Sequence, residues 1–225
     1  MHEETLSPSV YRFRPHWEVL PAGTQLWRMH SSRYAAEEFK PFIPDDPAPG
    51  RFHGTPEDPY PCLYAATDAE TALAETLLRS RPFDPETGMR LVPWASVRGK
   101  SLNVARTRCE LNLVSLCSGA ALAAVCQDHL LLENEGPEHY ADTRLWAREI
   151  RAQAPEAMGM IWGSKRNPSR RALVLFGDRL GHSADGPLEA LPYRSIPDLG
   201  SPDGIKEANQ LLEPLRSAIK EPIHR

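Results

Sequence analysis

The sequence predicts a single mixed α+β domain. Its 225 residues suit one domain, and 41% of them are hydrophobic, which is enough to build a buried core. The segments that suit β-strands are short and irregularly spaced, and this spacing disfavours a doubly wound parallel sheet. No GxGxxG motif follows a strand, so we do not expect a dinucleotide to be held in the Rossmann manner.

The charge balance and the apolar pattern exclude several functions. The net charge of −4 and the sequence pI of about 6.1 argue against direct binding of nucleic acid, which requires a basic surface. No apolar run is long enough to cross a membrane. The first residues lack the basic-then-apolar pattern of a signal peptide, so we expect a cytoplasmic protein.

The cysteines point in the same direction. None of the four forms a CxxC pair, and we interpret them as reduced thiols rather than as disulfides or metal ligands. We therefore expect no metal site at Cys62, Cys109, Cys117 and Cys126.

Residues 50–79 organise the chain. Residues 50–61, called the arginine loop below, combine Arg51 with several glycines and prolines, which favour an irregular path. Residues 62–66 suit a short strand with Tyr64 at its centre. The arginine and the tyrosine are therefore expected on adjacent elements.

A helix is predicted directly after that strand, beginning near residue 68. Thr67 and Glu70 have the spacing of a capping box, and apolar residues then recur at helical spacing. Glu75 falls inside this helix, one turn before Arg79. A loop, a strand and a helix in succession can aim an arginine, a tyrosine and a glutamate at one cleft.

The other elements follow from apolar runs and from proline-rich breaks. We expect an irregular N-terminal arm over residues 1–24. A proline- and glycine-rich segment with a C-terminal helix, packed back on the domain, is expected over residues 181–225. Further strands are predicted at residues 25–30, 91–97, 111–116, 158–162 and 172–176, and further helices at 118–125, 140–154 and 205–219.

Seven short pieces of the sequence, in register, resemble a RES domain: LWR, GRFHG, LYAA, AETALAETL, DTRLWAREI, GMIWGSKR and ALVLFGDR. The similarity indicates a RES domain over residues 25–180. The family takes its name from an arginine, a glutamate and a serine. They match Arg51 (with Arg28 as the alternative), Glu75 and Ser164, while Tyr64 matches a tyrosine that family members use.

This resemblance implies a fold and a function. RES proteins are similar to ADP-ribosyltransferases, so we expect small, mostly antiparallel sheets flanked by helices around a cleft. They are toxins of bacterial toxin–antitoxin pairs and degrade NAD, and their antitoxins carry a DNA-binding domain and block the cleft. The resemblance thus implies NAD as substrate and a cognate antitoxin, while a homo-oligomer stays open. The chemistry needs no metal, and a cluster of basic residues beside Ser164 leads us to expect the antitoxin contact at or close to that cluster. Those basic residues are Lys165, Arg166, Arg170 and Arg171.

The sequence departs from the family pattern at three places. Family members usually carry a Trp-Asn pair after the loop arginine, where this chain has Phe52 and His53. The gap from Arg51 to Tyr64 is longer than usual, and Arg79 stands where a histidine is common. We interpret His53 as incidental to the chemistry.

The residue types fit the cleavage of NAD. Breaking the nicotinamide–ribose bond passes through an oxocarbenium-like state, which a carboxylate such as Glu75 stabilises. A guanidinium, from Arg51 or Arg28, binds a diphosphate in a bidentate way. Tyr64 offers a flat face to nicotinamide. Ser164 offers a hydroxyl that orients ribose or nicotinamide. Nothing in the sequence places a histidine beside Ser164 as a base, so we do not interpret it as a nucleophile.

Alternatives stay open at this point. The same cleft would serve hydrolysis, phosphorolysis or transfer of ADP-ribose to a protein target, and a non-catalytic binding module could keep the fold. Without the resemblance, Arg51 suits a solvated loop, Tyr64 a core strand and Ser164 a turn. Glu75 then suits a helix surface, paired with Arg79.

Overall fold

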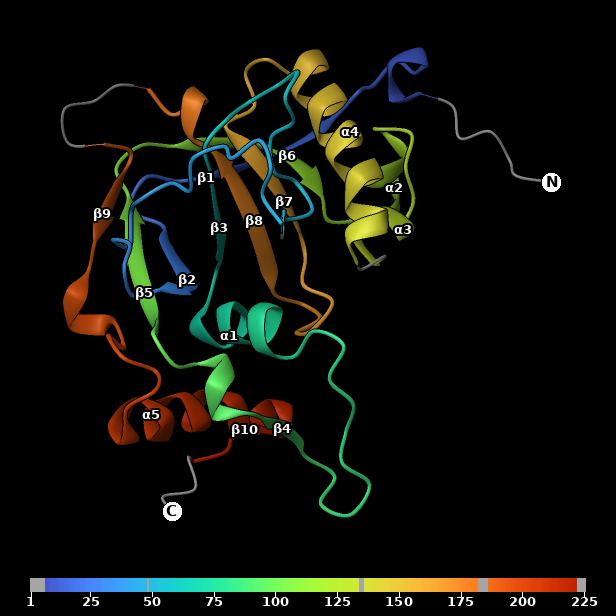
Figure 1. Cartoon of the computed structure of the whole chain (residues 1–225). Helices are drawn as coiled ribbons and strands as arrows, with labels where there is room; N and C mark the ends of the chain where they lie inside the picture. Colours follow the sequence, from blue (N-terminus) through green and yellow to red (C-terminus); the bar gives the residue numbers. More distant parts are fainter. Residues whose placement is uncertain (1–6, 48, 134–135, 182–185, 222–225) are drawn as a thin grey trace.

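The computed structural model describes residues 7–47, 49–133, 136–181 and 186–221. Its main feature is an eight-stranded sheet in the order β1-β6-β7-β8-β3-β2-β5-β9, in which only the β6–β7 pair is parallel (Figure 1). In that order the strands are His16–Leu20, Leu111–Leu116, Gly159–Gly163, Arg171–Phe176, Cys62–Ala66, Gln25–Ser31, Lys100–Thr107 and Leu188–Ala190.

The large sheet consists of two halves. Strands β2 and β3 share a single registered pair, Trp27 with Ala66, whereas β2 pairs with β5 and β3 with β8 along their whole lengths. Leu26 of β2, Leu63 of β3 and Leu173 of β8 lie in one buried cluster, so the sheet curls and its halves pack on each other. The expected small, mostly antiparallel sheets are thus joined at one point, and the site described below lies there.

Alternation along β8 explains why its sequence is apolar throughout. Ala172, Val174 and Phe176 belong to the buried cluster that includes helix α4 (Pro137–Gln153), while Leu173 and Leu175 belong to the cluster between the sheet halves. Successive residues of a strand point to opposite faces, and here both faces are covered.

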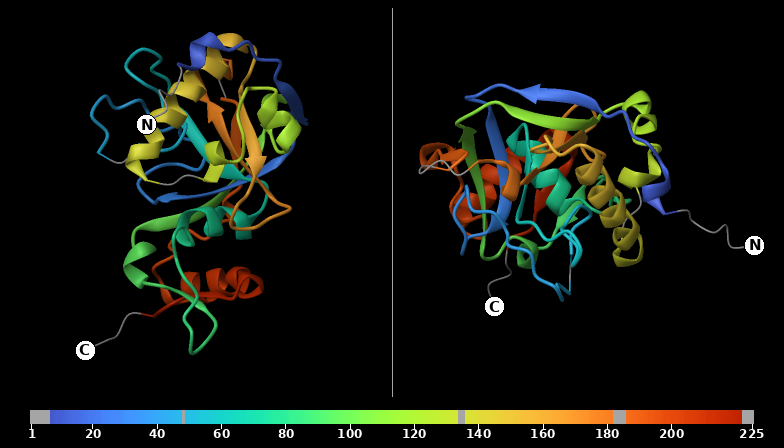
Figure 2. Two further views of the ribbon diagram at one scale, coloured as in Figure 1. Left: turned by 90° about the vertical axis from the view of Figure 1, so that its right-hand side faces the viewer. Right: turned by 90° about the horizontal axis from the view of Figure 1, so that it is seen from above.

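Helix α1 (Ala69–Leu77) joins the large sheet to a second layer. Figure 1 shows it between the sheet and the layer formed by α5 (Pro202–Leu212) and the two-stranded parallel sheet of β4 (Arg90–Val92) and β10 (Ser217–Ile219). Leu73 of α1 shares a buried cluster with Ala208 and Leu212 of α5. Helices α2 (Gly119–Ala123) and α4 gather at the opposite end of the molecule from α5 (Figure 2), and α3 (Leu130–Glu133) precedes α4.

The cap of α1 differs from the prediction. Asp68, not Thr67, caps the helix, and its Oδ1 accepts hydrogen bonds from the amide (2.8 Å) and hydroxyl (2.6 Å) of Thr71. A carboxylate at this position also interacts favourably with the helix dipole. The Thr67 hydroxyl instead lies within hydrogen-bonding distance of the Asp68 carboxylate (3.3 Å) and of the carbonyl of Arg171 (3.4 Å), at the start of β8.

Residues 7–24 of the N-terminal arm are more ordered than predicted, whereas residues 1–6 lie outside the described residues. The arm contains β1, which pairs with β6 along its whole length, and its Tyr11 and Phe13 rings lie 5.6 and 5.8 Å from that of Trp146 on α4. The Gln153 side chain bonds to the backbone of both residues. Packing on α4 thus orders a segment whose composition alone suggests irregular structure.

Two other regions also differ from the prediction. Strand β5, the longest strand, was not predicted, because Leu102 and Val104 alternate there with polar residues whose partners are distant in sequence. In the predicted strand 91–97 only β4 forms, since Pro93 lacks an amide donor and a 3₁₀ turn follows it. The predicted helix 205–219 ends at Leu212, and Arg216 adopts a left-handed conformation before β10.

Candidate active site

A cavity of about 520 Å³ opens where the two sheet halves meet. Strands β2 and β3, helix α1, the arginine loop and the turn after β7 form its walls. Its size is typical of a small-molecule site. The lining residues are Trp27, Arg28, Met29, Lys40, Gly50, Arg51, His53, Tyr64, Ala65, Ala66, Ala72, Glu75, Thr76, Arg79, Leu132, Trp162, Gly163, Lys165, Arg166 and Ala172.

Glu75 is the only carboxylate among the described residues that line this cavity. Its Oε1 accepts a hydrogen bond of 2.6 Å from the hydroxyl of Ser164. That hydroxyl also accepts hydrogen bonds from the amides of Arg166 (3.2 Å) and Asn167 (3.0 Å). Because the two amides orient its lone pairs, the Ser164 hydroxyl directs its proton to Glu75.

Ser164 itself lies behind the cavity wall. Its side chain is buried, with 3% of the residue exposed, and it is not among the lining residues. The turn that carries it is fastened to α1 a second time, because the Asn167 side chain donates to the hydroxyl of Thr71 at 2.9 Å. Thr71 and Glu75 are one helical turn apart, so the turn holds α1 at two neighbouring points.

Arg51 lines the same cavity as Glu75 and is anchored to α3 and α4. Its Nη1 donates to the carbonyl of Leu131 at 2.5 Å, and its guanidinium lies 5.3 Å from the ring centre of Tyr140 on α4. Arg79 approaches the same ring at 5.9 Å and donates to the Tyr140 hydroxyl at 2.8 Å. Tyr140 thus holds two of the arginines that line the cavity, through cation–π contacts and a hydrogen bond.

Tyr64 connects the β3 strand to the arginine loop. Its hydroxyl accepts a hydrogen bond of 2.7 Å from the amide of Phe52. Burial raises the pKa of this phenol well above its ordinary value, so Tyr64 stays neutral. Phe52 is fully buried and meets the Trp162 ring edge-on at 5.3 Å. It therefore fills the interior behind Tyr64.

His53 lines the cavity as well. Its Nδ1 accepts a hydrogen bond of 3.0 Å from the amide of Gly50, and the Asp46 carboxylate lies 3.6 Å from the same nitrogen. Burial, and then the charge of Lys40, lower the pKa of His53 to about 4. The ring is therefore neutral near pH 7 and forms no ion pair with Asp46, since Nδ1 carries no proton while it accepts from an amide.

Arg28 also lines the cavity, but its hydrogen-bond partners lie in a different segment from those of Arg51. Its Nη1 donates to the carbonyls of Ala36 (3.1 Å) and Glu38 (2.6 Å), which ties β2 to the segment that follows it. Burial lowers the pKa of Arg28 to about 10, so the side chain stays charged. The carboxylates whose charges act on Arg28 are Glu38 and Glu37, whereas Glu75 is among the charges that act on Arg51.

The cavity is cationic in a protein of net charge −4. Such a concentration of one sign in a recessed site attracts an anion and raises its local concentration. Burial lowers the pKa of Arg51 and of Arg166 from an ordinary value of 12.5, and the charge of Glu75 opposes that shift in both. The basic lining residues are Arg28, Lys40, Arg51, Arg79, Lys165 and Arg166.

The predicted site residues therefore lie together, and Ser164 alone among them is buried behind the cavity wall. Arg28, Arg51, Tyr64 and Glu75 line the cavity, and Ser164 contacts Glu75 from behind. The sequence reasoning missed Tyr140, which touches two of the arginines from a helix that precedes β7. No local pattern around Tyr140 distinguishes it from an ordinary helix residue.

Among the described residues, no group of three or more His, Cys, Asp or Glu side chains has an arrangement that could hold a metal ion. In the same part of the chain, none of the helices is both long and apolar enough to span a membrane.

Comparison with known proteins identifies the family. A family model described as the RES domain matches residues 25–194, and the chain therefore belongs to the RES domain family. The fold is similar to a chain in the crystal structure of the M. tuberculosis MbcT–MbcA toxin–antitoxin complex. The TM-score is 0.54, and the match is 12% identical and covers 79% of this chain and 85% of that chain. The expected mixed α+β fold is confirmed by this similarity. A search of curated proteins finds no match.

Proposed function

We propose that this chain is an NAD-consuming enzyme that breaks the nicotinamide–ribose bond, by hydrolysis or by phosphorolysis. The observation that carries the proposal is a single carboxylate, Glu75, fixed by a buried serine inside a cavity lined by six cations. NAD matches this arrangement because its diphosphate is anionic while its reacting centre becomes cationic. Membership of the RES domain family supports the same substrate.

Glu75 acts on the reacting ribose. As the bond from C1′ of the ribose to the nicotinamide nitrogen breaks, its electron pair leaves with nicotinamide and positive charge develops on the sugar. The carboxylate stabilises that charge, and an oxygen of water or phosphate then forms the new bond to C1′. Ser164 is a positioning residue in this scheme, since its hydroxyl donates to Glu75 from behind the cavity wall.

Arg51 binds the diphosphate. It is preferred over Arg28 because its guanidinium shares the Tyr140 ring with Arg79, which follows Glu75 by four residues. Arg28 instead donates to the carbonyls of Ala36 and Glu38. One Nη of Arg51 is anchored on the Leu131 carbonyl, which orients the guanidinium before the substrate arrives. The face of the Tyr64 ring contacts nicotinamide, while the Tyr64 hydroxyl accepts its hydrogen bond from the Phe52 amide.

The test is to incubate the purified protein with NAD, with and without phosphate, and with candidate protein targets. Free nicotinamide with ADP-ribose indicates hydrolysis, and a phosphorylated sugar product that requires phosphate indicates phosphorolysis. Label that passes from NAD to a protein indicates ADP-ribosyl transfer instead. No consumption of NAD under any of these conditions overturns the enzymatic proposal and favours a binding module.

We further propose a toxin role with a cognate antitoxin, which carries a DNA-binding domain and blocks the cavity. The similar solved structure belongs to a toxin–antitoxin complex, and Lys165 and Arg166 stand at the cavity wall beside the exposed Arg170. An acidic segment of a partner would complement this surface. Co-expression with the product of the neighbouring open reading frame, followed by a pull-down and an NAD assay of the complex, tests the role. A neighbour that does not bind removes the toxin role and leaves the enzyme.

A further inference from the structure

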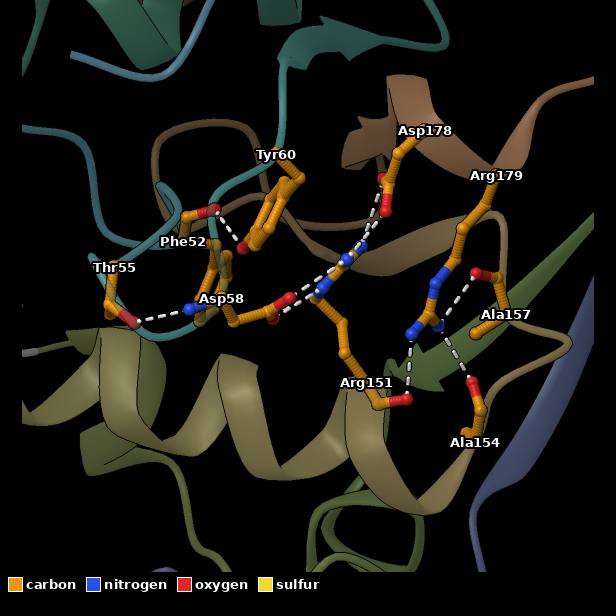
Figure 3. Close-up of polar contacts among 9 residues, drawn as sticks. All are labelled: Phe52, Thr55, Asp58, Tyr60, Arg151, Ala154, Ala157, Asp178 and Arg179. Atoms are coloured by element: carbon orange, nitrogen blue, oxygen red, sulfur yellow. Dashed lines mark hydrogen bonds and ion pairs between the residues drawn. The ribbon is translucent and has the colours of Figure 1, made fainter.

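A buried arginine outside the cavity holds three segments together. Arg151 lies near the end of α4 with 3% of its side chain exposed (Figure 3). Its Nε and Nη2 donate to the two oxygens of Asp58 at 2.7 and 3.2 Å. Its Nη1 and Nη2 donate to the two oxygens of Asp178 at 3.2 and 2.8 Å. The guanidinium is thus paired on two edges by bidentate contacts.

The surroundings of Arg151 make this pairing rigid. Its guanidinium carbon lies 3.8 Å from the ring centre of Tyr60 and 4.6 Å from that of Phe176. Arg179 donates to the carbonyls of Arg151, Ala154 and Ala157, which satisfies acceptors at the end of α4 (Figure 3). The two arginines and two aspartates of this group, Arg151, Arg179, Asp58 and Asp178, have a net charge of zero.

Asp58 and Tyr60 belong to the arginine loop, which is bound to itself and to α4 (Figure 3). The Tyr60 hydroxyl donates to the carbonyl of Phe52 at 2.8 Å, one residue after Arg51. The Thr143 hydroxyl of α4 donates to the carbonyl of Arg51 itself at 2.7 Å. Thr143 and Arg151 are eight residues apart, so α4 grips the loop at two points about 12 Å apart along its axis.

We propose that Arg151 is a positioning residue for the candidate site, because through Asp58 it holds the arginine loop on α4 and thereby sets where Arg51 meets the substrate diphosphate. The inference rests on the proposed function for its substrate and on the contacts above for its geometry. Asp178 follows β8 and lies outside the loop, so its pair with Arg151 serves the fold alone.

This asymmetry supplies a matched control. Asp58→Asn and Asp178→Asn each remove one carboxylate charge from the same arginine, and both positions are partly exposed, at 26% and 38%. We expect Asp58→Asn to raise the KM for NAD about fivefold with kcat within about twofold, since a diphosphate contact acts in ground and transition states alike. Asp178→Asn should leave KM within about twofold of wild type. In an Arg51→Ala background, Asp58→Asn should add nothing.

Amide hydrogen exchange measures how firmly the arginine loop is held, and it requires no substrate. The amides of residues 51–60 should exchange faster in Asp58→Asn than in Asp178→Asn. If Asp58→Asn folds poorly, Asp58→Glu and Asp178→Glu provide the comparison, because each keeps the charge and disturbs the bidentate geometry of one of the two pairs only.

Three results separate the two proposals. Equal KM values for the two Asn variants, or an Asp58→Asn effect that persists without Arg51, would overturn the positioning role. Equal amide exchange in the two variants would overturn the inference that Arg151 holds the arginine loop on α4 through Asp58. A wild-type protein that neither binds nor cleaves NAD overturns the proposed function alone, and the exchange comparison then decides whether Arg151 holds the loop.

Discussion

Replacing Glu75 by glutamine removes one charge from the cavity and leaves its shape intact. The amide oxygen of glutamine still accepts the hydrogen bond that Ser164 now donates to Oε1. The folded structure therefore changes little, and we expect the free energy of unfolding to shift by about 0.5 kcal/mol. What is lost is the negative charge beside the developing ribosyl cation, and such a group contributes about 3–4 kcal/mol, or a factor of about 10²–10³ in kcat.

The expected change in KM is much smaller. Glu75 repels the anionic diphosphate of NAD, but it attracts the cationic nicotinamide ring, whose bond to C1′ lies beside the carboxylate in the proposed mechanism. These two ground-state interactions oppose each other, so removing the charge should change KM by less than about threefold. A collapse of kcat at nearly constant KM is a result that an exposed surface glutamate would not produce.

Steady-state NAD turnover and NAD binding by calorimetry measure the two effects separately. Glu70→Gln is the matched control, because it makes the same change on the same helix at a residue outside the cavity lining. It should leave both constants within about twofold of wild type. A folded Glu75→Gln protein with the full wild-type kcat would remove the carboxylate from the mechanism.

Three further substitutions extend the test. Ser164→Ala should lower kcat about tenfold at constant KM, because Glu75 loses its orienting hydrogen bond; a raised KM in the same NAD assay would instead indicate direct contact with substrate. Arg51→Ala should raise KM about tenfold or more and weaken NAD binding in calorimetry, since the diphosphate is charged in the ground state; unchanged binding would exclude it as the diphosphate ligand. His53→Asn should reduce the loss of stability in acid. The folded pKa of about 4 lies below the ordinary 6.5, so the unfolded chain takes up the proton first, and stability present above about pH 6.5 is lost as the pH falls toward 4. Thermal unfolding midpoints at about pH 7.5 and pH 5 measure this, and an equal fall in wild type and variant would contradict it.

Local sequence signals were sufficient for the β3–α1 unit. Strand β3 spans Cys62–Ala66 as predicted, and Glu75 occupies the predicted helix, because an apolar run and a helical repeat are short-range patterns. The predicted N-cap was wrong by one residue, because Thr67 and Asp68 are both residue types that suit an N-cap. Thr67 contacts β8 instead, and Asp68 caps the helix.

Long-range pairing decided the elements that were missed. Strand β1 forms because β6 accepts it as a neighbour, and β5 forms between β2 and β9 with few apolar residues of its own. Neither segment has a local pattern strong enough to predict a strand, because their hydrogen-bond partners are far away in the chain.

The sequence by itself determined the family, the mixed fold class and four of the residues that line the cavity, Arg28, Arg51, Tyr64 and Glu75. Only the tertiary structure decided that Ser164, 89 residues beyond Glu75, approaches that carboxylate from behind the wall. It likewise decided that Tyr140 stands between two arginines, since a side chain's neighbours across such distances depend on how helices and strands pack, which no local pattern encodes.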